Sequence, residues 1–584
     1  MIATDRFERR EWLIVGVLTL IGAVLRIRGF GHLGLTHFDE GIYAFSGLWS
    51  VTPNGFDPQV ISYAPPGFPI LVGLSYVIFG VADFSAILVA IVCGVFTIPT
   101  AAWVGRRTFG PGAGAAAAAF AALSLAHIAF SRKALTDAPF LLCWLLAFGI
   151  GGWFLEKPGA WRAVLLGLSV GIAENFKYNG WIAGVIVALA GIFGLFAAGS
   201  NRPRRSVAET FGFGLLAALV SALCYYPWYA YVERHGGYSA LIQHQRGYLG
   251  PNGTWLSYLR QQLAQVIALS GGVGWGMLTW TVAWFASALV VMRKGEGAAP
   301  SRLSPFRLFL GCLIGVVAIT TVPDLGWWVG LAWAVRLALD ARSTYRMLAS
   351  FWLILSVMTP FYHPYARLWL PLHATGWLLL AGAVVRFGPF LETLPTHWEN
   401  RKRLPRQFIA QLVVMLICIT VAKTHWGPVG PRILSPMRIF ARTDNLREVA
   451  ARIANMPTPK KNRGIKFRVL ARRPLYFYFA LIGANPVQLL ASATSLTSGP
   501  GSTGDWAVLD SVQLSGSPED ESAWRSIVSQ WRLRQSIEVE LDPIVLLDVF
   551  PQAVSPGFEI HRAWISVLGD SPAGDDDPST QRVF

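Results

Sequence analysis

The segment FSAILVAIVCGVFTIPTAAWV, residues 84–104, decides the fold class because it continues for 21 residues without a charged side chain. A helix of that length spans about 30 Å, which is the thickness of the hydrocarbon core of a bilayer. In the whole chain of 584 residues, 53% are hydrophobic and 14% are charged, against roughly a quarter charged in soluble domains. The sequence therefore predicts a polytopic α-helical membrane protein.

Similar apolar runs recur along the first three quarters of the chain. We expect thirteen crossings, with the N-terminus inside, at residues 11–29, 84–104, 112–130, 138–155, 163–176, 179–198, 209–230, 268–292, 307–322, 325–340, 347–361, 369–386 and 408–422. A shorter apolar segment, 66–80, carries Pro66 and Pro69, which favours a re-entrant or interfacial helix. A true crossing by this segment is the alternative, and it would place Asp137 inside.

Basic loops between the apolar runs orient the chain. The strongest positive clusters belong on the inner side, because Lys and Arg in short loops favour it, and they lie at 202–205, 293–307, 341–346 and 399–407. Alternation from these loops places the first loop, the segment 131–137 and the C-terminal tail outside. The net charge of +16 thus reflects topology and lipid headgroups, and we expect no nucleic-acid partner.

The tail differs in composition from the rest of the chain. From about residue 423 it has ordinary polarity, with strand-like runs such as WAVLD and helix-like runs such as NLREVAARIA. We therefore expect a transmembrane domain over 1–422, with its first outer loop at 31–65, and a soluble α/β domain over 423–584 on the outer side. The five cysteines all lie in apolar runs without metal-binding spacing.

The first outer loop contains an acidic pair in an unusual setting. In HFDEGIYA, residues 37–44, Asp39 and Glu40 lie between Phe38 and Tyr43 rather than in a solvated run of charges. The residues that follow have the apolar spacing of an amphipathic helix in the membrane interface. Carboxylates at the start of such a helix would be held at headgroup depth, where a lipid phosphate and its sugar reside.

Other polar residues are expected on the same side of the membrane. These are Asp137, the cations Arg132, Lys133, Lys177, Arg246 and Arg367, and nearby His244, His363 and Tyr63. Each has a structural alternative. Lys and Arg at span ends often extend to headgroups, aromatic residues form interfacial belts, and Asp137 in TDAPF could cap a helix.

Four motifs follow one another in order. They are D-E-x-x-Y-A at 39–44, YAPPGFP at 63–69, S-R-x-x-x-T-D-A-P at 131–139 and FKYNG at 176–180. With the later HPYARLWLP at 363–371, the chain resembles the GT-C class of membrane glycosyltransferases, and more narrowly the protein mannosyltransferase and aminoarabinose transferase branch, which is glycosyltransferase family 39-like. The resemblance implies transfer of a sugar from a polyprenyl-phosphate donor to an acceptor on the outer face.

The resemblance also assigns candidate roles. Asp39 matches the catalytic base, Glu40 its acidic neighbour, Asp137 the second acidic residue and Lys177 a lysine of the following span pair. The chain departs from the aminoarabinose branch at Ala64, where a lysine commonly faces the donor phosphate, and at Ile42, where an arginine is typical. Another cation must therefore meet the phosphate, and the candidates for this region are Lys177, Arg367, Arg132, His363 and Tyr63.

The implied chemistry is one displacement at the anomeric carbon with inversion. It needs a carboxylate as base and cations at the leaving phosphate. No cofactor is required, although a divalent metal would be able to bridge the carboxylates and the phosphate.

Other interpretations stay open from the sequence. A transporter or flippase of lipid-linked sugars, a non-catalytic membrane scaffold, and an oligosaccharyltransferase that uses pyrophosphate donors are the alternatives. We expect residence in the inner (plasma) membrane, and the acceptor is open among protein, lipid and glycan.

Overall fold

The computed structural model describes the residues 9–52, 64–196, 204–249, 254–260, 334–362, 365–392, 436–456, 467–482, 487–489, 506–514, 527, 531–549 and 562–570. The predicted spans 268–292, 307–322 and 408–422, and most of 325–340, lie outside these residues. So do the candidate site residues His363 and Tyr63.

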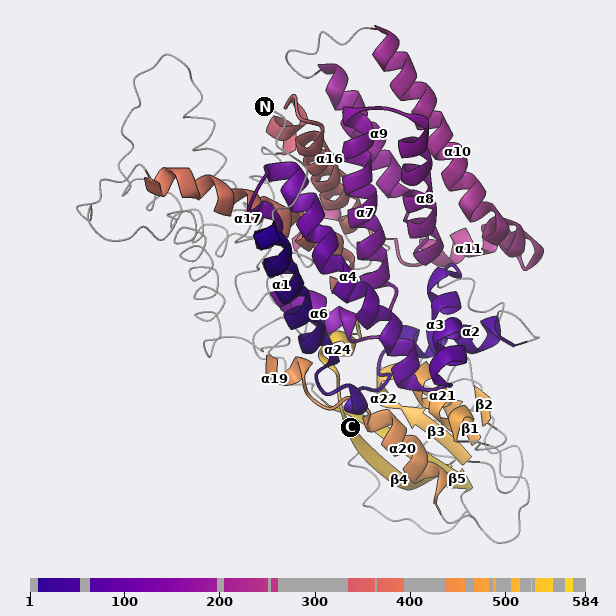
Figure 1. Ribbon diagram of the computed structural model, residues 1–584. Coiled ribbons are helices and arrows are strands. Elements are labelled where there is room, and N and C mark those ends of the chain that lie inside the picture. The colour runs from indigo at the N-terminus through magenta and orange to yellow at the C-terminus, as the bar shows by residue number, and fades with distance from the viewer. Residues whose placement is uncertain are drawn as a thin grey trace, which may run out of the picture.

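The described residues form a helical bundle with a mixed sheet against one end (Figure 1). The helices of the bundle are α1 (Arg9–Ile27), α4 (Asp83–Phe109), α5 (Ala113–Leu123), α6 (Leu125–Ser131), α7 (Asp137–Glu156), α8 (Ala160–Phe176), α9 (Ile182–Phe196), α10 (Arg204–Arg234), α16 (Ser343–Met358) and α17 (Leu370–Glu392). Among them α1, α4, α7 and α10 are each long and apolar enough to cross a membrane, and α5 with α6 is a fifth if the bent pair is one span. The chain is thus a multi-pass membrane protein, and the number of thirteen crossings stays a prediction.

Helix α1 illustrates why these segments suit a bilayer. Its residues Leu13, Val17, Leu20 and Val24 are exposed and recur at helical spacing, whereas Val15 packs against the other helices. A continuous apolar stripe of this kind would be unfavourable in water but is solvated by lipid chains.

The break between α5 and α6 explains the arginine near the end of the first span. The two helices meet at an angle of 60°, so carbonyl groups at the end of α5 lose helical partners. Arg26 is fully buried and donates from Nη2 to the carbonyl of Ala121 at 3.1 Å. Its Nη2 also lies 2.8 Å from Nδ1 of His127 in α6. Arg26 therefore fixes the bend that leads into the segment 131–137.

Helices α2 (Phe38–Ser50) and α3 (Gly67–Phe79) lie together at the end of the bundle that faces the sheet, called here the sheet end (Figure 1). Helix α3 has 13 residues, or about 20 Å, which is short for a crossing. Arg447 contacts both Asp83, the first residue of α4, and the carbonyl of Leu33. Leu33 and Asp83 therefore both lie at the sheet end, as expected if α3 does not cross the membrane.

The environment of α2 differs from the predicted lipid-facing helix. Residues 40–47 are all buried, because α3 covers one side and α21 (Arg473–Leu481) covers another. The approach is close at Gly41, where a Cβ atom would lie 2.3 Å from a backbone atom of Arg473. The amphipathic pattern of α2 is thus satisfied by the C-terminal part of the chain rather than by lipid.

The C-terminal part contains a small mixed sheet, as predicted for an α/β unit. Its five strands have the order β2-β1-β3-β5-β4, with β1 parallel to both β2 and β3, and β5 antiparallel to β3 and β4. The strands are β1 (Phe467–Leu470), β2 (Val487–Leu489), β3 (Trp506–Asp510), β4 (Trp531–Glu540) and β5 (Arg562–Asp570), and the helices α20 (Asn445–Ala454) and α24 (Pro543–Val549) accompany them. Strand β3 is buried throughout, as expected for its central place.

A polar network joins this sheet to the segment just before α2. The Tyr478 hydroxyl accepts from the backbone N–H of Leu35 at 2.7 Å and donates to Asp83 at 2.9 Å. Arg472 pairs with Asp510 at 2.6 Å and donates to the carbonyl of Thr36 at 3.3 Å. These groups are almost all buried, so the contacts fix the sheet against the residues just before Asp39.

Candidate active site

Asp39 lies at the start of α2 and faces Arg367. Its Oδ2 accepts from Nη1 of Arg367 at 2.7 Å, although the two residues are 328 positions apart. Only 15% of the Asp39 side chain and 12% of the Arg367 side chain are exposed. Burial alone would raise the pKa of Asp39, but the charge of Arg367 outweighs it and holds the pKa below its ordinary value of 3.8. Asp39 is therefore ionised at neutral pH.

A second pair, Asp137 and Lys177, lies beside the first. Asp137 is the first residue of α7, and Lys177 directly follows α8. Nζ of Lys177 donates to Oδ1 of Asp137 at 2.7 Å, while Oδ2 of Asp137 is buried without a hydrogen-bond partner in the described part of the chain. The charge of Lys177 also lowers the pKa of Asp39. Two carboxylates and two cations predicted from separate motifs thus share one site.

Glu40 is oriented differently from its neighbour Asp39. It is completely buried, and Oε2 accepts from the backbone N–H groups of Thr36 and His37, both at 2.8 Å. Its Oε1 accepts from the N–H of Ala134, also at 2.8 Å. Glu40 therefore ties the start of α2 to the segment that leads to Asp137.

Asp548 is a member of the cluster that the sequence did not reveal. It lies near the end of α24, and its Oδ2 is 3.0 Å from Nε2 of His37 and 3.4 Å from Nε of Arg367. Nδ1 of His37 accepts from the backbone N–H of Asp39 at 3.1 Å, so Nε2 must carry the proton that bonds to Asp548. The one available signal was an acidic residue inside the apolar run PIVLLDVF of the tail.

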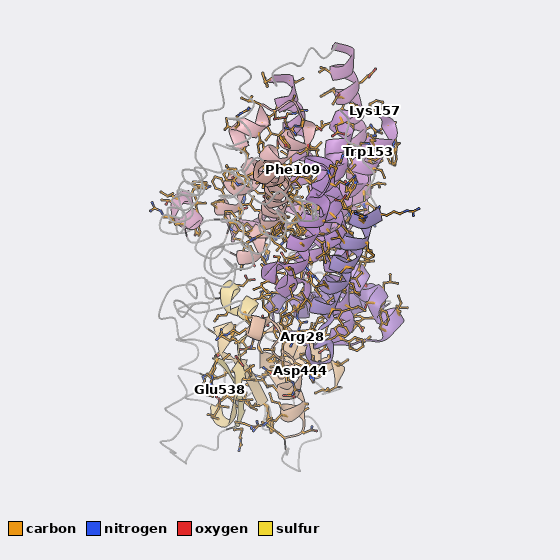
Figure 2. The ribbon with its side chains drawn as sticks, turned by 60° about the vertical axis from the view of Figure 1, so that its left-hand side comes forward. Arg28, Phe109, Trp153, Lys157, Asp444 and Glu538 are labelled. Carbon is orange, nitrogen blue, oxygen red and sulfur yellow. The ribbon has the colours of Figure 1, made fainter. Side chains whose placement is uncertain are left out.

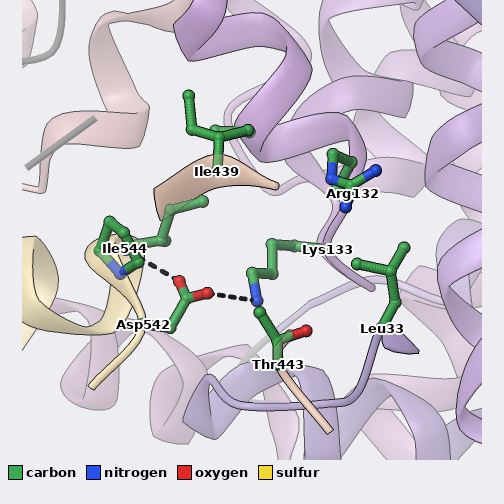
Figure 3. A pocket seen from close by; sticks show the side chains of 9 residues that line it. Leu33, Arg132, Lys133, Ile439, Thr443, Asp542 and Ile544 are labelled. Atoms are coloured by element: carbon green, nitrogen blue, oxygen red, sulfur yellow. Dashed lines mark hydrogen bonds and ion pairs between the residues drawn. The ribbon is translucent and has the colours of Figure 1, made fainter. Parts of the chain in front are cut away.

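Arg132 and Lys133 lie at the junction with the C-terminal part. Nη1 of Arg132 donates to the carbonyl of Arg26 at 2.9 Å. Nζ of Lys133 pairs with Asp542 at 2.8 Å and donates to Thr36 at 2.9 Å. Both cations line a cavity of about 20 Å³ between the end of α6 and the start of α24 (Figure 3). Their contacts in the structure are with this junction.

Tyr365 contacts Arg367 and belongs to a cluster of aromatic rings. The guanidinium lies 4.8 Å from the ring centre of Tyr365, and Tyr248 stacks on Tyr362 with ring centres 5.7 Å apart. The Tyr362 hydroxyl donates to Gln245 of α11 (Gly237–Arg246) at 2.9 Å. The predicted outer loop around Arg246 and His244 therefore contacts the segment that carries Arg367. Aromatic faces beside a carboxylate and a cation suit a ligand that is partly apolar and partly charged.

The site has no metal ligand group in the part of the chain that the structure describes. No set of three or more His, Cys, Asp or Glu side chains there is arranged to hold a metal ion.

The sequence and the fold were compared with known proteins. Residues 63–231 match the family described as dolichyl-phosphate-mannose-protein mannosyltransferase, which confirms the resemblance predicted from the motifs. No curated protein matches the sequence.

Solved structures with similarity to the chain are distant in sequence. The apo oligosaccharyltransferase of Archaeoglobus fulgidus has 13% identity and a TM-score of 0.50, covering 90% of this chain and 73% of that one. ArnT from Cupriavidus metallidurans, crystallised with undecaprenyl phosphate, has 14% identity and a TM-score of 0.48, covering 97% of this chain and 100% of that one. The oligosaccharyltransferase similarity indicates a shared fold.

Proposed function

We propose that this chain, whose residues 63–231 match the protein mannosyltransferase family, is a membrane glycosyltransferase that transfers a sugar from a polyprenyl-phosphate donor to an acceptor on the outer face of the membrane. The family description names a dolichyl-phosphate sugar, which belongs to this donor class. The observation that carries the proposal is the ionised Asp39 held against Arg367, with Asp137 and Lys177 beside them.

Asp39 is the proposed general base. It accepts the proton of the acceptor's nucleophilic group while that group attacks the anomeric carbon. The bond from this carbon to the phosphate oxygen breaks, and the electron pair leaves with the polyprenyl phosphate. A single displacement inverts the anomeric configuration. The low pKa of Asp39 keeps the base in its reactive form, which would be lost only at a pH below 3.8.

Arg367 and Lys177 are the proposed contacts of the donor phosphate. The planar guanidinium of Arg367 suits two phosphate oxygens, and the ammonium of Lys177 supplies a point charge. The Lys177 side chain is 22% exposed, more than the other three charged groups of the site. Both cations already lie beside carboxylates, so they are oriented before the donor arrives, and charge that develops on the leaving phosphate needs little rearrangement.

The remaining candidates take supporting roles in this proposal. Asp137 orients Lys177, and Glu40 positions Asp39 through backbone contacts. Arg132 stabilises the junction with the C-terminal part. His363 and Tyr63 lie outside the described residues and stay candidates for the phosphate site.

The orientation of the chain is also a proposal. The sheet end carries Arg28, Asp444 and Glu538, and the opposite end carries Phe109, Trp153 and Lys157 (Figure 2). We place the sheet end outside and the opposite end inside, since the basic loop at 105–110 would then be cytoplasmic. With α3 as a helix that does not cross, the thirteen predicted spans give this arrangement.

Substitution of Asp39 tests the proposed chemistry. Asp39→Asn keeps the shape of the side chain but cannot accept the proton, so we expect a loss of sugar transfer of about 10²–10⁴-fold with donor binding retained. Transfer is measured with purified protein and radiolabelled polyprenyl-phosphate sugar in detergent. Asp340→Asn is the matched control, because Asp340 precedes α16 and pairs with Arg342. Near-normal turnover of Asp39→Asn would remove the base from the mechanism. A wild-type protein that moves the donor lipid across vesicles but never transfers its sugar would favour the transporter.

A further inference from the structure

The charged groups at the proposed base close into a ring. Arg367 bonds Asp39 through Nη1 at 2.7 Å and approaches Asp548 through Nε at 3.4 Å. Asp548 in turn accepts from His37 at 3.0 Å, and His37 accepts from the backbone N–H of Asp39 at 3.1 Å. Asp548 is therefore the link between the two groups that hold Asp39 in place.

The ring is almost completely removed from solvent. The exposed fractions are 3% for the Asp548 side chain and 7% for that of His37. Oδ1 of Asp548 is buried without a hydrogen-bond partner among the described residues, which is an unfavourable arrangement for a carboxylate that serves stability alone. Buried charged groups with an unpaired oxygen are more typical of functional sites than of packing contacts.

Helix α24 delivers Asp548 because it is fixed at both ends. Asp542 precedes the helix, accepts from the N–H of Ile544 at 2.9 Å and pairs with Lys133 at 2.8 Å (Figure 3). Asp548 meets His37 and Arg367 near the other end. The two carboxylates thus join the same C-terminal helix to the transmembrane part, but only Asp548 reaches the groups that contact Asp39.

We infer that Asp548 is a positioning residue of the active site, supplied by the C-terminal part of the chain. The inference rests on the proposed role of Asp39 as the base. Asp548 shares the guanidinium of Arg367 with Asp39, so Arg367 stays oriented without being neutralised by Asp39 alone. Through His37 it also fixes the first turn of α2, on which Asp39 lies. The C-terminal part therefore completes the site rather than only covering it.

The matched pair Asp548→Asn and Asp542→Asn tests this inference. Asp548→Asn keeps the shape and loses the charge, and we expect kcat to fall about 10–100-fold because misplacement of a reacting group on the order of 1 Å has that effect. The KM for the donor should change less than the kcat. Asp542→Asn breaks an ion pair of the same helix without touching the ring, so its kcat should stay within about threefold of wild type.

The pH profile separates a positioning role from a purely structural one. The titratable groups that face Asp39 come from several elements: His37 before α2, Tyr43 in α2, Asp137 in α7, Lys177 after α8, Tyr362, Tyr365 and Arg367 before α17, and Asp548 in α24. Without the negative charge of Asp548, Arg367 pairs with Asp39 alone, and the pKa of Asp39 falls. The acid limb of kcat should therefore move to lower pH in Asp548→Asn and stay unchanged in Asp542→Asn.

Each outcome of these measurements supports or overturns the inferred role of Asp548. An Asp548→Asn enzyme with wild-type kcat and pH profile overturns the inference while leaving the proposed function intact, whereas an active Asp39→Asn enzyme overturns the proposed function itself. Equal losses in Asp548→Asn and Asp542→Asn would assign the effect to docking and also overturn the inference. If Asp548→Asn does not fold, Asp548→Glu takes its place, because it keeps the charge on a longer side chain. A folded Asp548→Glu enzyme with a lowered kcat and a wild-type acid limb supports the inference. A wild-type kcat contradicts it.

Discussion

Replacement of Glu40 by Gln distinguishes a structural carboxylate from a chemical one. In the structure Glu40 accepts four hydrogen bonds: from the backbone N–H groups of Thr36, His37 and Ala134, each at 2.8 Å, and from the hydroxyl of Thr36 at 3.2 Å. Glutamine has one carbonyl oxygen. If this oxygen keeps the bonds to Thr36 and His37, the amide NH₂ must face the N–H of Ala134.

The expected loss of stability follows from these contacts. One hydrogen bond to a charged acceptor is lost, worth about 1.5–3 kcal/mol, and a buried donor is left without an acceptor, at about 1–3 kcal/mol. The sum is roughly 2.5–6 kcal/mol. We expect Glu40→Gln to lower the midpoint of thermal unfolding in detergent by several degrees. Transfer activity should fall with it, because the first turn of α2 carries Asp39.

The assay compares thermal unfolding and sugar transfer on the same purified samples. Glu448→Gln is the control, because Glu448 lies on α20 with 57% of its side chain exposed, where an ion pair contributes little. An unchanged unfolding midpoint together with a loss of transfer above about 100-fold would refute the reasoning and make Glu40 part of the chemistry. Unchanged values of both would mean that the four contacts do not determine the position of α2.

Two further predictions concern the phosphate and the orientation. Arg367→Ala should weaken binding of the donor lipid by about 1–3 kcal/mol, with Arg367→Lys restoring it only in part; unchanged affinity in both variants would place the phosphate elsewhere. In a background without the five native cysteines, Glu538→Cys should react with an impermeant thiol reagent in intact spheroplasts and Lys157→Cys only after permeabilisation, because the two residues lie at opposite ends of the bundle. The reverse pattern would invert the proposed topology.

The membrane character and the main polar residues of the site were accessible from the sequence. Hydrocarbon requires about 20 apolar residues for each helix, and this requirement is local, so it is visible in any segment such as 84–104. Polar motifs between spans can then be assigned to one side by alternation. That reasoning selected Asp39, Asp137, Lys177 and Arg367, which the structure brings together, although their catalytic roles stay predictions.

Composition and spacing could not distinguish Asp39 from Glu40, and only the family resemblance assigned them different roles. Adjacent residues on a helix differ by about 100° in direction, so one carboxylate faces Arg367 while the other faces backbone N–H groups. Both residues are acidic, and both are expected at the same depth in the membrane interface. Only the packing around α2 decides which oxygen atoms meet a guanidinium and which meet the loop at Ala134.

Tertiary structure alone decided which distant parts of the chain meet. The sequence by itself indicated which segments are apolar enough to form membrane helices and which polar residues lie between them, because these depend on hydropathy and helical rise along a single segment. The pairing of Asp39 with Arg367, and the arrival of Asp548 from a tail without a motif, depend on how the helices pack and on how the sheet docks onto α2. The strength of an ion pair depends on the distance between its charges. No local pattern of side chains determines that distance for residues hundreds of positions apart in the sequence.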